Sequence, residues 1–207
     1  MEKYDDEPDL VARSREGDLA AFNALVERYQ RPLYNLCLRM LASPEAAEDA
    51  TQEAFIHSFR SIHTFRGGSL KSWLFRIAAN ACYDEMRRRR ARPAVSLDEP
   101  HGADERRLDV RDSGPAPQER AEHRELAEAL QDALTRLPPD QRLAIVLADV
   151  HGLDYSEVAE ITACSLGTVK SRISRGRRQL RLILRERGEL LPSHLRQVSE
   201  GQNDVVA

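Results

Sequence analysis

The sequence predicts an all-α protein of two small helical bundle domains joined by a flexible linker, with a helix-turn-helix in the C-terminal bundle. Apolar residues recur with helical spacing on both sides of residues 93–117. That segment holds four prolines, two glycines and many charges without an apolar period, which is typical of a linker. Nearer the C-terminus, two short amphipathic segments flank a tight turn at Ala163 and Cys164.

The turn joins two predicted helices. Asp154 and Glu157 have the spacing of a capping box, which marks the start of the first helix. Ser165 is suited to cap the second helix. Its apolar positions recur at i, i+4, i+7 and i+11 and predict one buried stripe of Val169, Ile173, Gly176 and Leu180. Two short helices in this arrangement are typical of a helix-turn-helix.

The outward face of the second helix is polar and basic. Its donors suit phosphate oxygens and the acceptor edge of guanine in a major groove. They are Thr168, Lys170, Ser171, Arg172, Arg175, Arg177 and Arg178. The alternative is an amphipathic helix pair whose basic face is only solvated. The helix caps, the tight turn and the one-sided basic charge together favour DNA binding.

Charge is segregated along the chain. The 207 residues have a net charge of −3, yet residues 164–187 carry eight Lys or Arg against one Glu, and residues 66–92 carry eight against two acids. Attraction to phosphate is screened within roughly 10 Å at 0.1 M salt, so local charge matters more than the sum. No apolar run approaches the roughly 20 residues of a membrane span, and the acidic start is unlike a signal peptide. We expect a cytoplasmic protein without membrane insertion.

Cysteine and histidine positions argue against a metal site or an enzyme. Cys37, Cys82 and Cys164 lack metal-ligand spacing and cannot all pair, so three reduced, mostly buried thiols are expected, with a thiol switch as the alternative. The six histidines are scattered, and the sequence has no phosphate loop, HExxH, CxxC or nucleophile elbow. We therefore expect no cofactor and no catalytic residue.

The N-terminal part predicts three long helices and a short one at residues 8–16. The first long helix starts near Asp18 and contains Pro32, a candidate kink. The second opens with Ser43 as N-cap and Pro44 at the first helical position, and Phe59 is among its inward residues. Its opposite face is acidic and polar, with Glu45, Glu48, Asp49, Gln52, Glu53 and Ile56. Such a face is either only solvated or a partner surface for a basic coiled coil.

The third long helix follows the loop HTFRGGSLKSW. Its buried stripe includes Trp73 as a core anchor, and another face carries Arg76, Asn80, Tyr83, Asp84 and Arg87. The glycine-rich loop beside Phe65 and Arg66 could cradle an unstacked base, or be a plain connection. The run of arginines at 87–90 suits the negative end of the helix dipole, although four exceed what capping needs.

Two stretches resemble the extracytoplasmic-function (ECF) group of bacterial sigma factors in the sigma-70 superfamily, the promoter-recognition subunits of RNA polymerase. They are AAEDATQEAFIHSFRSIHTFRGGSLKSWLFRIAANACYDEMRRRR and LPPDQRLAIVLADVHGLDYSEVAEITACSLGTVKSRISRGRRQL, and the resemblance covers about residues 10–187. It implies sigma region 2 at residues 1–92, the linker at 93–117 and region 4 at 118–187. Residues 188–207 are expected to be a disordered tail.

The resemblance implies contacts with core RNA polymerase through the clamp coiled coil of its largest subunit and through its flap region. The implied polymerase-binding residues are Glu45, Glu48, Asp49, Gln52, Glu53, Phe55 and Ile56. Acids of the linker would mimic nucleic-acid charge near the active-site cleft and RNA exit path. They are Asp98, Glu99, Asp104, Glu105 and Asp109. An anti-sigma factor is the expected regulator.

The resemblance also implies two DNA contacts. The third helix and its loop would recognise and melt the −10 element, with Asn80 best placed for a base edge. The implied −10 residues are Phe65, Arg66, Ser69, Lys71, Trp73, Arg76, Asn80, Asp84, Arg87 and Arg88. The −35 duplex would be read by Ser165, Thr168, Lys170, Ser171, Arg172, Arg175, Arg177 and Arg178. Melting needs no ATP if the unstacked strand binds more tightly than the duplex.

One position departs from the family pattern. Where the family commonly has a hydrophobic residue and glycine entering the turn, this chain has Thr162 and Ala163. Alanine with positive φ costs on the order of 1 kcal/mol, so either the turn differs or the strain is tolerated. The alternative function is a stand-alone helix-turn-helix regulator acting as a dimer, which would not need the first bundle.

Overall fold

The structure, a computed structural model, describes residues 6–91 and 117–186, and every regular element in these ranges is helical. The elements are α1 (Glu7–Arg15), α2 (Leu19–Leu41), α3 (Pro44–Ser61), η1 (Ile62–Thr64), α4 (Leu70–Ala91), α5 (Pro117–Thr135), α6 (Pro139–Ile145), η2 (Val146–Val150), α7 (Tyr155–Thr162) and α8 (Leu166–Glu186). The all-α prediction is therefore confirmed. Apart from Pro117, the predicted linker lies outside the described residues, as do the linker acids and the tail.

The two central helices of the first bundle, α2 and α3, begin at the residues that the sequence predicts. The carboxylate of Asp18 accepts from the backbone N–H groups of Ala20 and Ala21 at 2.9 and 3.1 Å, and α2 then continues through Pro32 to Leu41. The hydroxyl of Ser43 accepts from the first turn of α3 at 3.3 Å. These oxygens satisfy donors that the helix leaves unpaired, which is why both helices start where they do.

The core of the first bundle lies between α2, α3 and α4, with α1 packed on α2. The Tyr29 hydroxyl donates to the Glu7 carboxylate at 2.6 Å and ties α1 to α2. Phe59 is less enclosed than predicted, because its side chain is 38% exposed and meets Phe22 edge-on at 5.0 Å between ring centroids. Cys37 and Cys82 are buried free thiols, whereas Cys164 in the second bundle is half-buried.

The second bundle packs α8 across α6 and α7. Asp154 accepts from the N–H groups of Ser156 and Glu157 while the Glu157 carboxylate accepts from Asp154 N–H, which confirms the capping box. The predicted stripe of α8 is buried at Val169, Ile173 and Gly176, and only half-buried at Leu180. A Cβ at Gly176 would lie 2.6 Å from Ile145 Cδ1, so glycine permits the close approach of α8 to α6.

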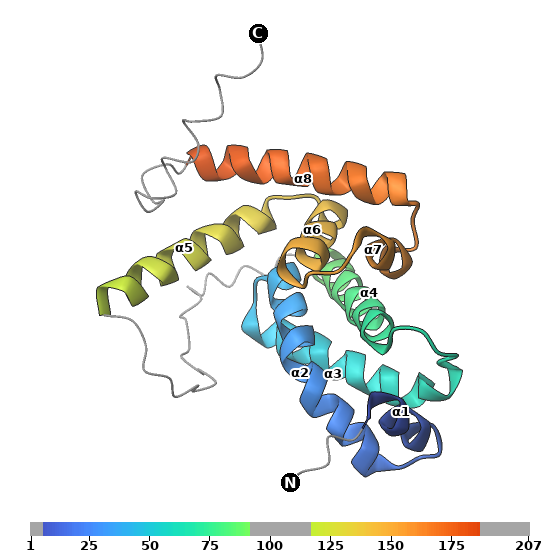
Figure 1. The fold of residues 1–207 in the computed structure, drawn as a ribbon. Helices are drawn as coiled ribbons and strands as arrows, with labels where there is room; N and C mark the ends of the chain where they lie inside the picture. Colours follow the sequence, from blue (N-terminus) through green and yellow to red (C-terminus); the bar gives the residue numbers. More distant parts are fainter. Residues whose placement is uncertain (1–5, 92–116, 187–207) are drawn as a thin grey trace.

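The two bundles contact one another along α4 and the C-terminal end of α2. In Figure 1, α7 lies beside α4, while α5 and α6 meet the end of α2. The rings of Phe75 in α4 and His151 after η2 pack edge to face with centroids 4.8 Å apart. The two bundles therefore form one packed body in the described part of the chain.

The turn before α8 adopts a left-handed conformation at alanine. Ala163 has φ 50° and ψ 44°, and the N–H groups of Ala163 and Cys164 donate back to the carbonyls of Glu160 and Ala159 at 3.4 and 3.1 Å. This is the bonding of a Schellman motif, in which glycine is the usual left-handed residue. The turn therefore has Schellman geometry with alanine in the left-handed position, and the strain of that alanine is tolerated.

We expect Ala163→Gly to stabilise the protein by up to about 1 kcal/mol, because glycine relieves the steric cost of the left-handed conformation. Urea unfolding followed by circular dichroism measures the change. Ala159→Gly, inside α7, is the matched control and should destabilise by about 1 kcal/mol instead. A lower unfolding free energy for Ala163→Gly would show that the turn is not strained.

Candidate nucleic-acid interface

The outward face of α8 is polar, and most of its side chains are exposed. Ser165 Oγ accepts from the Thr168 N–H at 3.2 Å and lies 2.9 Å from the Thr168 hydroxyl, so this pair caps the start of the helix. Thr168 and Arg172 are half-buried. We define the α8 basic face as the exposed predicted side chains Lys170, Ser171, Arg175, Arg177 and Arg178.

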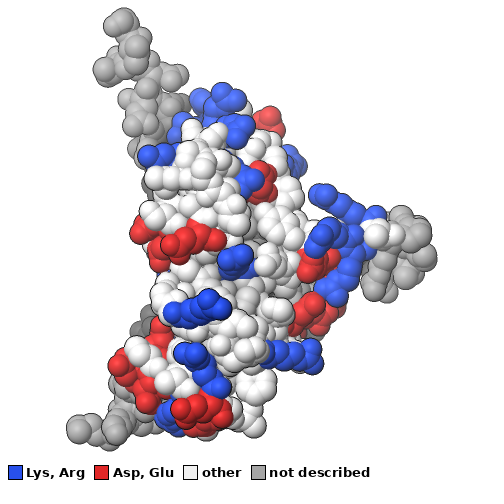
Figure 2. Space-filling model, turned by 90° about the vertical axis from the view of Figure 1, so that its right-hand side faces the viewer, with Lys and Arg blue, Asp and Glu red and all other residues white. Residues whose placement is uncertain are grey.

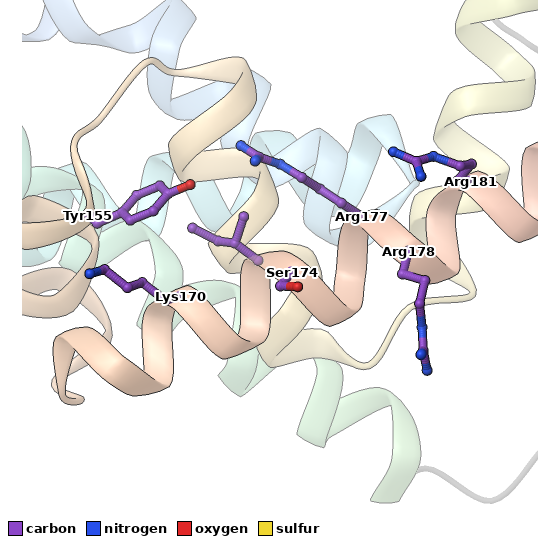
Figure 3. A pocket seen from close by; sticks show the side chains of 7 residues that line it. Tyr155, Lys170, Ser174, Arg177, Arg178 and Arg181 are labelled. Carbon is purple, nitrogen blue, oxygen red and sulfur yellow. The ribbon is translucent and has the colours of Figure 1, made fainter. Parts of the chain in front are cut away.

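A shallow hollow of about 380 Å³ runs along this helix on the side of α7. Figure 3 shows basic side chains leaving α8 in several directions around it, with Tyr155 from α7 near Lys170. The lining residues are Tyr155, Lys170, Ile173, Ser174, Arg177, Arg178 and Arg181. Guanidinium and ammonium donors around a concave surface suit the phosphates of a duplex.

Two of the predicted −35 side chains make ion pairs inside the bundle. Arg177 Nε lies 2.9 Å from Asp149 Oδ2 and forms a second bond to the same carboxylate, which raises the pKa of Arg177. Arg172 Nε lies 2.9 Å from Asp140 Oδ2, with its side chain only 24% exposed. Of the predicted −35 cations, Lys170, Arg175 and Arg178 are therefore the most available to DNA.

The loop before α4 leaves some predicted −10 residues exposed and buries another. Gly67 and Gly68 have φ values of 99° and 90°, which glycine adopts without strain. Ser69 is exposed and its hydroxyl accepts from the Ser72 N–H at 3.1 Å, so it caps α4. Phe65 is only 8% exposed and packs on Trp73 with ring centroids 5.5 Å apart. Phe65 supports the half-buried Trp73 rather than presenting its own ring to a base.

An exposed polar face continues along α4. Arg76 and Asn80 are exposed and lie one turn apart. Arg87 and Arg88 are exposed nearer the C-terminal end of α4. Arg87 bonds to Asp84. Arg88 lies 2.9 Å from Glu53 of α3, which raises the pKa of Arg88. We define the α4 polar face as the exposed loop residues Arg66 and Ser69 together with the half-buried Trp73 and the exposed Arg76 and Asn80 of α4.

The acidic side of α3 faces solvent. Glu45, Glu48, Asp49, Gln52 and Glu53 are all exposed, and Ile56 beside them is 46% exposed. Phe55 is half-buried against the core. Acidic side chains around an exposed isoleucine form a surface that suits a basic partner with an apolar centre.

Basic side chains are spread over the side of the molecule drawn in Figure 2 and do not form one strip there. Figure 2 shows lysine and arginine side chains at separate places on this side of the molecule, with acidic and uncharged side chains between them. In residues 6–91 and 117–186, no three His, Cys, Asp or Glu side chains gather as a metal site. None of the helices described there is long and apolar enough to cross a membrane.

The comparisons with known proteins match both bundles. A family model described as Sigma-70 region 2 matches residues 25–92, and one described as Sigma-70, region 4 matches residues 127–180. The ECF RNA polymerase sigma factor SigM of Mycobacterium tuberculosis is 35% identical over 177 residues, which cover 85% of this chain and 83% of SigM. The chain belongs to the ECF group of sigma-70 family sigma factors.

This sigma factor is also similar to two other ECF sigma factors. It is 39% identical over 175 residues to the ECF RNA polymerase sigma-E factor of Escherichia coli, covering 81% of this chain and 88% of the relative. It is also 39% identical over 168 residues to SigE of Mycolicibacterium smegmatis, covering 80% of this chain but only 63% of the length of that relative.

Two solved structures resemble this sigma factor. One is the sigma factor RpoE in complex with the anti-sigma factor NepR from Bartonella quintana, with a TM-score of 0.61 and 27% identity over 79% of this chain and 96% of that one. The other is CnrH in complex with the cytosolic domain of CnrY, with a TM-score of 0.64 and 24% identity over 86% of this chain and 96% of that one. The second likeness shows the fold alone.

One predicted −10 residue of this sigma factor is engaged between the bundles. Lys71 Nζ donates to the His151 carbonyl at 3.3 Å and lies 5.8 Å from the centre of the Phe75 ring. Burial of the His151 imidazole, together with the positive charges of Lys71 and Arg39, lowers the pKa of His151 from 6.5 to about 4. Its Nε2 is buried and has no partner among the described residues.

We expect the folded protein to lose stability through His151 as the pH falls from about 6.5 to about 4, because the unfolded chain takes up the proton first. Above pH 6.5 both states hold a neutral imidazole and the effect vanishes. Unfolding free energies of the protein and of His151→Gln, compared across this range, isolate the contribution. This expectation would be contradicted if the difference in unfolding free energy between the two proteins did not change with pH. It would also be contradicted if His151 titrated near pH 6.5 by NMR.

Sequence reasoning missed some residues around the α8 hollow. Ser174 and Arg181 were outside the predicted set, although Lys170, Ser174, Arg177 and Arg181 follow i, i+4, i+7 and i+11 and so share one side of α8. This helical spacing could have identified Ser174 and Arg181 from the sequence. Tyr155 reaches the hollow from α7, and no pattern within α8 points to it.

Proposed function

We propose that this sigma factor binds core RNA polymerase and directs promoter-specific initiation by reading the −35 element as duplex and the −10 element as melted DNA. The observation that carries the proposal is the pairing of two exposed faces in one chain. The α4 polar face offers an amide and a guanidinium beside Trp73, and the α8 basic face offers Lys170, Arg175 and Arg178. The first set suits an unstacked base, and the second suits a major groove.

The division of labour follows the two bundles. We propose that residues 1–92 dock on polymerase and capture the −10 element, that residues 118–187 read the −35 element, and that residues 93–117 connect them. Residues 188–207 form a tail in this proposal. The protein acts by binding alone, without a catalytic residue or cofactor, and it works in the cytoplasm where polymerase and promoters are.

The α3 acidic side is the proposed docking surface for core polymerase. It combines exposed acids with the exposed Ile56, and a basic coiled coil of the clamp complements both. Glu53 already pairs with Arg88 at 2.9 Å, so Glu45, Glu48 and Asp49 supply the main charge contacts, and the neutral amide of Gln52 adds hydrogen bonds. The second bundle would meet the flap region, which fixes the spacing of the two DNA faces.

Strand separation in this proposal is driven by binding. A protein that holds the unstacked strand more tightly than the duplex shifts the equilibrium by its differential affinity, so no nucleotide hydrolysis is needed. Exposed Asn80 can pair with a base edge, and Trp73 offers a partly exposed ring for stacking. Stacking contributes about 1–3 kcal/mol per base, which is comparable to the cost of unstacking.

We further propose control by an anti-sigma factor. The relative RpoE was solved in complex with the anti-sigma factor NepR, and its fold aligns over 79% of this chain. An inhibitor bound across both bundles would cover the α4 polar face and the α8 basic face at once.

Run-off transcription with core polymerase and a library of genomic promoter fragments tests the proposed function. New start sites that depend on both core polymerase and this protein are the expected result. A dimeric stand-alone regulator would instead bind one specific duplex tightly without core polymerase. Footprinting by the pure protein alone, combined with no new start sites, would favour that alternative.

A further inference from the structure

Arg177 of α8 is held in place by an acid from a neighbouring helix. Its Nε donates to Asp149 Oδ2 at 2.9 Å, and one of its Nη atoms donates to the other oxygen of the same carboxylate. This bidentate geometry joins two planar groups and fixes both the position and the orientation of the guanidinium. The side chains of Arg177 and Asp149 are 48% and 34% exposed, so the pair lies at the surface.

Close packing of α8 on α6 brings the two charges together. Gly176 approaches α6 so closely that a Cβ at this position would lie 2.6 Å from Ile145 Cδ1. Arg177 is the next residue of α8, and Asp149 lies about one turn beyond Ile145, in η2. A larger residue at position 176 would push the two helices apart and separate the pair. The ion pair is therefore built by helix packing and does not depend on two flexible side chains meeting in solvent.

The pair leaves donors of Arg177 free on the side of the α8 hollow. A guanidinium has five N–H donors, and the two bonds to Asp149 leave three for other partners. Arg177 lines the hollow together with Lys170 and Tyr155. Figure 3 shows the Tyr155 hydroxyl pointing toward the Arg177 guanidinium, while Arg178 points away from it. A phosphate in the hollow can therefore accept from Arg177 without displacing Asp149.

The pair carries no net charge, which changes how it acts on DNA. A cation that neutralises a DNA phosphate releases counterions, and each such contact steepens the salt dependence of binding by about 0.9. Arg177 and Asp149 together add no charge, so they contribute little to binding at random positions on a duplex. A fixed guanidinium still donates hydrogen bonds, but only where a phosphate lies in the correct place, as when α8 is docked on its own recognition sequence.

We propose that Asp149 is a positioning residue that increases the sequence specificity of the α8 basic face. By neutralising and fixing Arg177, Asp149 lowers sequence-independent binding and preserves one phosphate contact at the correct site. The ratio of these two affinities is what matters in a genome, because each recognition site competes with a large excess of other DNA. The role at the −35 element rests on the proposed function, whereas the fixed and neutralised arginine does not.

Asp149→Asn is the test variant, because asparagine is similar in size and removes the charge. Glu125→Gln is the matched control, since Glu125 is an exposed acid of α5 outside the hollow and its loss changes the net charge equally. The double variant Asp149→Asn with Arg177→Ala removes one charge of each sign together with the phosphate contact. Unchanged helix content by circular dichroism shows that each variant is folded.

Binding of the full chain to a fluorescent duplex of shuffled sequence tests the neutralisation. In 0.1 M salt, Asp149→Asn should bind up to about eightfold more tightly, the factor that one added contact with a slope of 0.9 produces between 1 M and 0.1 M salt. Its salt dependence should be steeper by about 0.9, and the double variant should return to the original slope. An unchanged slope for Asp149→Asn, or an equal change for Glu125→Gln, would overturn the proposal.

Specificity is measured with the −35 duplex of a promoter found by run-off transcription. Asp149→Asn should gain at most about twofold on this duplex, because the added charge is offset by the loss of a fixed phosphate contact. The ratio of −35 affinity to shuffled-duplex affinity should therefore fall at least about fourfold. An unchanged ratio would overturn the role of Asp149 in specificity, even if both affinities rise.

NMR of the full chain without DNA tests whether Arg177 is fixed. The Arg177 Nε–H of the unmodified protein should give a signal that is protected from exchange with water, and Asp149→Asn should remove that protection. Rapid exchange of this proton in the unmodified protein would show that the arginine is not held, which would overturn the proposal. Neither this readout nor the shuffled duplex depends on promoter recognition, so failure of the inference is distinguishable from failure of the proposed function.

Discussion

Replacing Glu48 and Asp49 together by lysine is expected to abolish holoenzyme formation. Both carboxylates are exposed on the acidic side of α3, beside Ile56. Against a basic coiled coil, each reversal turns an attraction into a repulsion, and like charges held at an interface cost several kcal/mol. The affinity for core polymerase should fall by at least about a hundredfold. Fluorescence anisotropy of the labelled protein titrated with core polymerase measures this.

The matched control for the charge reversal is Glu16→Lys together with Glu27→Lys. These acids are also exposed, lie outside α3 and produce the same net charge. The control should retain polymerase affinity to within about threefold at physiological salt, because charges beyond a Debye length of roughly 8 Å are screened. Equal losses in the two double variants would mean that only net charge matters and that α3 is not the docking surface.

Asn80→Ala is expected to remove base preference at one position of the −10 element. A side-chain amide offers a donor and an acceptor to a base edge, and one good bidentate contact discriminates by about 1–3 kcal/mol, or roughly 5- to 150-fold. Asn80 is exposed on α4 one turn from Arg76, where a flipped base could reach it. Open-complex yields on promoters with each −10 base substituted in turn measure the preference.

The control for this experiment is Asn23→Ala, an exposed asparagine on α2 outside the α4 polar face. It should leave the preference at every −10 position unchanged. Arg76→Ala should lower the open-complex yield by a similar factor on every promoter sequence. Its promoter affinity should also depend less steeply on salt concentration, as expected when a phosphate contact is lost. A uniform loss for Asn80→Ala, without a change in preference, would contradict base readout by this amide.

Local patterns predicted the helix-turn-helix well because its signals are local. The capping box of Asp154 and Glu157, the cap at Ser165 and the buried stripe from Val169 to Gly176 depend on residues within a turn or two of each other. The strain at Ala163 could also be anticipated from residue type. The start of α3 at Ser43 followed the same logic.

Contacts between distant residues could not be predicted in the same way. Arg142 reads in sequence as an ordinary surface arginine after a helix start, and its burial depends on the α2 carbonyl 102 residues earlier. Phe65 was expected beside a flipped base, yet Trp73 covers it. Arg172 falls on the outward side of α8 by spacing, but Asp140 of α6 draws it inward. The helical period predicts which side of a helix a residue occupies, but residues from other helices determine whether that side chain is buried or exposed.

Permanganate reactivity of promoter thymines, without any nucleotide present, tests the central claim most directly. Unpaired thymines of the −10 element should become reactive only when core polymerase and this protein are both present, since binding alone drives melting. The Asn80→Ala and the Glu48/Asp49 variants should lower that reactivity. Reactive thymines with the protein alone, or none with both partners on a promoter that is demonstrably bound, would contradict the account.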